Sequence, residues 1–250
     1  MTAAEPVASV SSSPNVDQTV APNTDTLVVS AIGIRRAVGW SGFLLPVGLL
    51  LGGYLCGVPV QDNISSYYHT PLRDLLVGTL SAMAVFLFCY RGNDWIENWT
   101  ANVGSFAALA VAFFPLDAAS DPLHQRSLVG YLHSVAGGVF FVTLAFYSLY
   151  HFPRRETASA TSTERNLVYR LSGIAILIAM MAMGAYLFLL PPDWKSIANR
   201  YNALFWLESL AAWCFAGAWL TKGKIIVAEL AIETLHRSRK ILLPGTVHSR

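Results

Sequence analysis

The stretch "VGYLHSVAGGVFFVTLAFYSLY" (residues 129–150) decides the fold class of this chain, because its 22 residues include no Lys, Arg, Asp or Glu. About 20 apolar residues suffice for a helix to cross the hydrocarbon layer of a membrane. Lipid offers no partner to a free backbone amide, so a spanning segment of this kind must be helical. We therefore expect a transmembrane helix here.

Five further runs are similarly long and mostly apolar, and over the whole chain 54% of the residues are apolar and 13% are charged. Soluble domains carry about 25% charged residues, and the helices of a soluble bundle would need a polar face that these runs lack. The sequence thus predicts an all-α, polytopic membrane helix bundle with six transmembrane helices. The predicted spans are residues 37–57, 72–90, 99–116, 129–150, 171–190 and 201–220.

The basic residues predict the orientation of these spans. When Lys and Arg are counted by alternate loops, 13 fall on one side of the membrane and four on the other. The side richer in Lys and Arg is normally cytoplasmic, so we expect both termini in the cytoplasm and a multi-pass protein of the plasma or inner membrane. Residues 1–34 are predicted to be a disordered cytoplasmic tail, residues 35–222 the six-helix domain, and residues 223–250 an amphipathic cytoplasmic segment.

Polar residues gather on the predicted extracytoplasmic side. The segment "NISSYYHTPLRD" (residues 63–74) precedes the second span, and its Ser65 and His69 share one face at i+4 spacing. His133 enters the fourth span, and Glu208 enters the sixth, where an ionisable group is costly unless it faces the bundle. We expect Glu208 to contact His133. Together with Asp74, these residues predict a polar pocket at the extracytoplasmic face.

A metal ion is the less favoured use of this pocket. Zinc is bound by histidine and carboxylate groups, and His69, His124 and His133 are the candidate ligands. The chain contains no HxxxH or HExxH pair, which such sites on one helix use. We therefore predict no cofactor and keep zinc as an alternative.

Membrane lipid is the predicted partner. Nucleic acid is not expected, because the basic residues are scattered among loops and do not form a stripe. Small residues at i+4 spacing let helices approach closely, and such faces are a candidate surface for homo-oligomer contacts. These faces comprise Gly48 and Gly52 in the first span, and Gly130, Ser134 and Gly138 in the fourth.

Three motifs carry a resemblance to a known family. They are "ISSYYHTPLRDLLVG" before the second span, "FFP" at the end of the third and "LHSVAGGVFF" in the fourth. Together they resemble the six-helix damage-regulated autophagy modulator and Sfk-type membrane proteins, whose bacterial relatives have no known function. The matching positions are Ile64, Ser65, Pro71, His133, Gly137, Phe140 and Phe141, while Ser66 stands where the family tends to have aspartate. The resemblance implies lipid handling or the organisation of membrane signalling.

A second likeness is to the alkaline ceramidases, which are intramembrane zinc hydrolases. Ser65 and His69 with Asp74 downstream resemble their first motif, but the last span reads "LFWLESLAAWCFAG" and lacks their HxxxH pair. Enzymatic activity is thus left open. The preferred function is lipid binding or membrane organisation, the alternative is a metal-dependent lipid amidase or esterase, and the third is a proton-coupled transporter that uses Glu208 and His133.

Overall fold

The computed structural model describes residues 24–92, 94–118, 125–155 and 160–242, and in these ranges it contains helices and no strand. The prediction of an all-α fold is confirmed. The long helices are α1 (Thr24–Cys56), α2 (Arg73–Cys89), α3 (Trp95–Phe113), α4 (Leu128–Phe146), α5 (Ala160–Phe188) and α7 (Ala203–Leu242). The shorter elements are the 3-10 helix η1 (Ser65–His69), the π-turn η2 (Tyr147–His151), the 3-10 turn η3 (Pro153–Arg155) and helix α6 (Pro192–Arg200).

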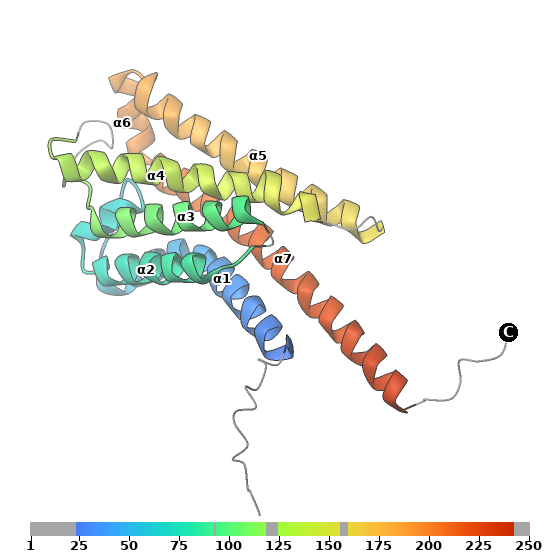
Figure 1. Ribbon diagram of the computed structural model, residues 1–250. Helices are drawn as coiled ribbons and strands as arrows, with labels where there is room; N and C mark the ends of the chain where they lie inside the picture. The colour runs from blue at the N-terminus through green and yellow to red at the C-terminus, as the bar shows by residue number, and fades with distance from the viewer. Residues whose placement is uncertain (1–23, 93, 119–124, 156–159, 243–250) are drawn as a thin grey trace, which may run out of the picture.

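Contacts between neighbouring long helices join the six of them in a ring, which Figure 1 shows from the side. Each of α1 to α4 packs against the next helix in the chain, α5 packs against α4 and α7, and α7 closes the ring against α1. Among these neighbours, α4 and α5 make the loosest contact, and Figure 1 shows them separating away from the turn that joins them. The ring thus has one weakly closed side.

Glycines allow the tightly packed pairs to approach. A Cβ atom at Gly52 of α1 would lie 2.8 Å from the side chain of Leu72, and one at Gly104 of α3 would lie 2.9 Å from that of Thr143 on α4. Neither position leaves room for a larger residue without a shift of its neighbour. The small-residue face of α1 therefore contacts this same chain, and an oligomer interface stays a prediction.

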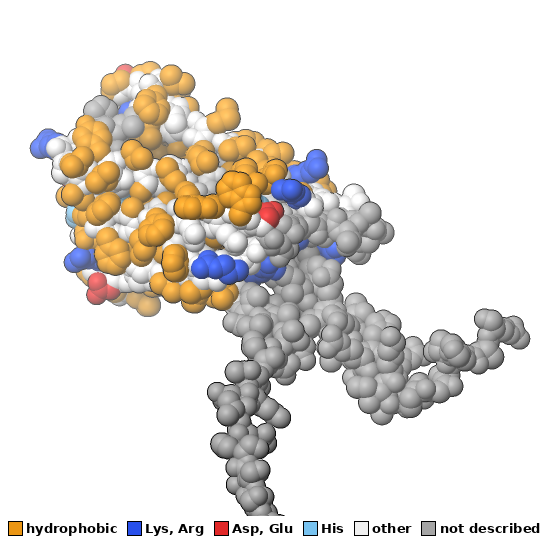
Figure 2. Space-filling model, in the orientation of Figure 1, with side chains coloured by type: hydrophobic (Ala, Val, Ile, Leu, Met, Phe, Trp, Pro, Cys, Tyr) orange, Lys and Arg blue, Asp and Glu red, His pale blue; other side chains and the backbone are white. Residues whose placement is uncertain are grey.

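Four helical stretches are long and apolar enough to cross a membrane: Gly33–Cys56, Leu128–His151, Thr163–Phe188 and Ala203–Gly223. Many large apolar side chains are exposed on the bundle, and Figure 2 shows them spread over one face. This is the kind of surface expected against lipid. The other two predicted spans form α2 and α3. Because α2 has 17 residues, it is about 26 Å long, slightly short of the hydrocarbon thickness.

The ends of the bundle differ from the expected segment boundaries. Helix α1 begins at Thr24, so residues 24–34 are helical although the sequence placed them in a disordered tail; residues 1–23 lie outside the described part. Helix α7 runs without a break to Leu242. The predicted C-terminal segment is thus a continuation of the last span over residues 223–242, and residues 243–250 lie outside the described part.

Candidate functional site

The segment between α1 and α2 is folded by its own polar side chains. Asn63 accepts two hydrogen bonds at its Oδ1 atom, from the backbone N–H of Ser66 (2.8 Å) and from the Ser66 hydroxyl (3.1 Å). At the other end the Thr70 hydroxyl donates to the carbonyl of Tyr67 (2.7 Å). Asn and Thr side chains commonly close turns in this way. These bonds hold η1 in place and direct Ser65 toward the bundle.

Two hydrogen bonds attach this segment to the start of α7. The backbone N–H of Phe205 donates to the carbonyl of Asp62 (2.9 Å), and the N–H of Ile64 donates to Glu208 Oε2 (2.7 Å). Ile64 directly precedes η1, and the N–H groups at the start of a helix have no partner within it. The carboxyl group of Glu208 accepts from this one. Glu208 therefore faces the bundle, as the cost of an ionisable group in lipid requires.

His133 of α4 reaches the same segment from the opposite side. Its side chain is buried, its Nδ1 atom hydrogen-bonds the carbonyl of Phe114, and its Nε2 atom lies 2.9 Å from Ser65 Oγ. A carbonyl can only accept, so Nδ1 carries the proton and the neutral ring accepts the Ser65 proton at Nε2. Glu208 and His133 are thus joined through the adjacent residues Ile64 and Ser65, and not by the direct contact expected from the sequence.

The loop that follows α3 supplies the carbonyls for both histidines. His69 Nε2 lies 2.7 Å from the carbonyl of Leu116. Beyond it, Asp117 accepts hydrogen bonds from the Ser127 hydroxyl (2.6 Å), the Ser127 N–H (2.9 Å) and the Arg126 N–H. These bonds hold the pKa of the Asp117 carboxyl below its ordinary value of 3.8, and the bond from the Ser127 hydroxyl has the largest effect. An ionised Asp117 thereby fixes the loop to the start of α4.

A cavity of about 340 Å³ lies inside the helix ring, and all six long helices contribute to its lining. Most of the lining is apolar, and Ser65, His133 and Glu208 meet it where η1 contacts α4 and α7. Gly138 of α4 and Phe188 of α5 both line the cavity and are exposed on the molecular surface. The cavity therefore opens between α4 and α5, the loosely packed side of the ring.

The structure brings together three of the five residues of the predicted pocket: Ser65, His133 and Glu208. His69 and Asp74 are exposed and do not line the cavity, and Asp74 lies in the first turn of α2. His124 lies outside the described residues. Zinc binding by His69, His124 and His133 stays a prediction, as does the absence of a cofactor.

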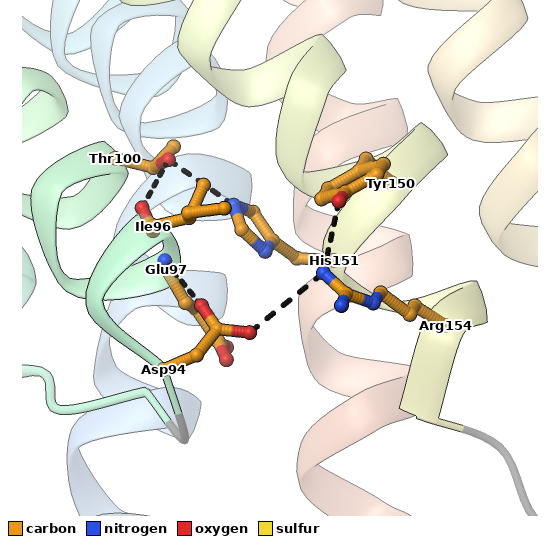
Figure 3. Close-up of polar contacts among 7 residues, drawn as sticks. All are labelled: Asp94, Ile96, Glu97, Thr100, Tyr150, His151 and Arg154. Atoms are coloured by element: carbon orange, nitrogen blue, oxygen red, sulfur yellow. Dashed lines mark hydrogen bonds and ion pairs between the residues drawn. The ribbon is translucent and has the colours of Figure 1, made fainter.

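A second polar cluster, which the sequence did not reveal, lies where the start of α3 meets the turn η2 that follows α4 (Figure 3). The potential ligand atoms of Asp94, Glu97 and His151 lie within 4.8 Å of one another. Arg154 lies 3.8 Å from Asp94, and His151 Nε2 lies 3.1 Å from the hydroxyl of Thr100. Glu97 and His151 are buried where the π-turn η2 meets α3, while Asp94 and Arg154 are partly exposed at the edge of this cluster.

Further bonds connect this cluster to α1 and α2. The Tyr90 hydroxyl donates to Glu97 Oε1 and receives a hydrogen bond from Arg35 (3.1 Å), while the Tyr147 hydroxyl donates to the Glu97 carbonyl (2.9 Å). Tyr90, directly after α2, and Tyr147, at the start of η2, thus bond Glu97, and Arg35 of α1 reaches it through Tyr90. The Asp-x-x-Glu spacing of a helix start marks Asp94 and Glu97 in the sequence, but nothing there indicates that His151 joins them.

In comparisons with known proteins, no family model, no curated protein and no solved structure matches the chain.

Proposed function

We propose that this chain is a six-span integral membrane protein that binds one single-chain lipid in the cavity inside its helix ring. The observation that carries the proposal is the meeting of Ser65, His133 and Glu208 at one place in the cavity lining. The lining is otherwise apolar apart from Ser134, whose hydroxyl donates to the carbonyl of Gly130. A few converging polar groups in an apolar pocket are typical of ligand sites. The polar groups would hold the head of the lipid, and the apolar lining would hold its chain.

The position of the opening supports this proposal. Helices α4 and α5 both contain stretches able to span a membrane, so an opening between them would face the lipid bilayer. A lipid could then enter sideways without passing through water. With both termini in the cytoplasm, the Ser65 end of the cavity would lie in the outer half of the bilayer. Lipid handling is also what the resemblance to the damage-regulated autophagy modulator family implies.

Filling the cavity tests the proposal. At Gly137 and Gly184, which line the cavity, an added Cβ atom would meet no atom within 4 Å. The double variant Gly137→Leu/Gly184→Leu should therefore fold, since leucine also favours a helix over glycine, and we expect it to lose at least about tenfold in lipid affinity, the equivalent of about 1.4 kcal/mol. The measurement is native mass spectrometry of lipid retained by protein in nanodiscs.

The matched control for this test is Gly78→Leu. Gly78 also has no atom within 4 Å of an added Cβ, and it lies on the exposed face of α2, away from the cavity. Its lipid retention should equal that of the unmodified chain. Equal retention by the double variant, the control and the unmodified chain would show that the cavity is not the lipid site.

One contact favours a second function, a lipid esterase or amidase. Ser65 Oγ lies 2.9 Å from His133 Nε2, and the other ring nitrogen of His133 is held by the carbonyl of Phe114. A hydroxyl within hydrogen-bond reach of an oriented base is the arrangement that activates a serine nucleophile. In this function Ser65 would attack the acyl carbonyl of a lipid in the cavity while His133 takes up the hydroxyl proton. His133 would then return the proton to the alcohol or amine as its bond to the acyl carbon breaks, and water would release the acyl group from Ser65.

A fluorophosphonate probe with an alkyl chain separates the two functions. A hydrolase should be labelled covalently at Ser65, and the Ser65→Ala variant should lose at least about a hundredfold in labelling rate, as expected for removal of a nucleophile and its base contact. A protein that only binds lipid should retain the probe without forming a bond. Labelling that persists in Ser65→Ala would exclude Ser65 as the nucleophile.

A further inference from the structure

We infer that the cavity selects a lipid whose head donates hydrogen bonds, an ammonium or a hydroxyl group, and that it disfavours carboxylate and phosphate heads. This inference rests on the proposed lipid-binding function and names the class of lipid. It follows from the hydrogen-bonding roles that the fold has already assigned to Ser65, His133 and Glu208.

The polar groups at the cavity are mainly acceptors. The proton of His133 is committed to the carbonyl of Phe114, and the proton of the Ser65 hydroxyl is committed to His133 Nε2. Ser65 can therefore offer only the lone pairs of its oxygen to a ligand. Glu208 uses one carboxyl oxygen for the N–H of Ile64, and in its ionised form its second oxygen can accept from a ligand. A ligand head must supply the protons for both groups.

The charges around the cavity lead to the same selection. Glu208 is the one ionisable acid among the described lining residues, and those residues include no Lys or Arg. A carboxylate or phosphate head would lie beside Glu208 without a cationic partner, which is costly in a low-dielectric site. An ammonium head would instead form a charge-assisted hydrogen bond with Glu208.

The variant Glu208→Gln should change the selection without loss of the local fold. The carbonyl oxygen of glutamine can keep the bond from the N–H of Ile64, and its NH2 group then faces the cavity in place of the second carboxyl oxygen. The position changes from an acceptor to a donor and loses its charge. A structural role of Glu208 alone would change stability but not the order in which heads are preferred.

The experiment compares dodecylamine, dodecanol and dodecanoate, which share one chain and differ in the head. Each is added to the protein in nanodiscs of zwitterionic lipid, and the bound amphiphile per chain is counted by native mass spectrometry. The signal from the cavity-filled variant Gly137→Leu/Gly184→Leu is subtracted, because it reports partition into the bilayer alone. We expect the amine and the alcohol to exceed dodecanoate by about tenfold or more.

Glu208→Gln should lower the binding of the amine to the level of the alcohol and raise that of dodecanoate. Binding of dodecanoate equal to the amine in the unmodified chain, or an order of heads that Glu208→Gln leaves unchanged, would overturn the head-group inference while lipid binding itself stands. If none of the three exceeds the cavity-filled variant, the proposed function fails and the inference fails with it.

Discussion

Replacing Glu97 with alanine is expected to lower the free energy of unfolding by about 3 kcal/mol, because a buried hydrogen bond to a charged group is lost and its partner is left unsatisfied. That partner is the hydroxyl of Tyr90, whose side chain is 4% exposed and which also receives a hydrogen bond from Arg35. The loss would loosen α1 and α2 from α3 at one end of the ring. Unfolding by sodium dodecyl sulfate in mixed micelles measures the effect.

The control for Glu97 is Glu164→Ala, because Glu164 is an exposed glutamate on α5. Its replacement should change the free energy of unfolding by less than about 0.5 kcal/mol, as is usual for surface substitutions. Glu97→Gln should lie between the two, since its side-chain carbonyl can still accept from Tyr90. Equal losses in Glu97→Ala and Glu164→Ala would mean that the second polar cluster does not hold the helices together.

Replacing His133 with alanine is expected to cost about 3 kcal/mol of unfolding free energy, since it removes two hydrogen bonds and leaves a cavity. The imidazole ring of His133 hydrogen-bonds both the carbonyl of Phe114 and the hydroxyl of Ser65, and His133 is only 6% exposed. Its loss would free η1 from α4. The same micelle titration measures it, with tryptophan fluorescence as the readout.

His69→Ala provides a control of the same residue type. His69 also hydrogen-bonds a backbone carbonyl of the loop after α3, but its side chain is exposed, so water can replace it and the loss should stay below about 1 kcal/mol. His133→Asn, whose amide can still donate toward Phe114, should recover part of the stability. If His69→Ala costs as much as His133→Ala, burial is not what makes His133 important.

The helical fold could be predicted because its cause is local. Runs such as residues 129–150 have no polar face and are too long for a strand, and lipid leaves a helix as the outcome. The limits of the helices were less predictable. Helices α1 and α7 both continue beyond their apolar runs, over residues 24–32 and past Gly223. Hydropathy does not mark where such a continuation ends.

Two residues of the candidate site could be predicted for an energetic reason, and a third could be predicted from its position. Glu208 and His133 lie in apolar spans where a polar group must face inward, and Ser65 precedes the second span on the same predicted side. His69 and Asp74 carry no such constraint, because they lie where water can solvate them, and the structure leaves both exposed. The sequence indicated which polar groups must avoid lipid, but not which partners they find.

By itself the sequence determined the helical class, the apolar outer surface and the inward placement of His133 and Glu208, since each of these follows from the cost of placing polar groups in lipid. Only the tertiary structure decided that Ile64 and Ser65 join these two residues, that Glu97 and His151 meet across α3 and η2, and that the ring opens between α4 and α5. The physical reason is that hydrogen bonds between residues 50 to 150 positions apart depend on how the helices cross, and helix crossings are set by packing of whole surfaces.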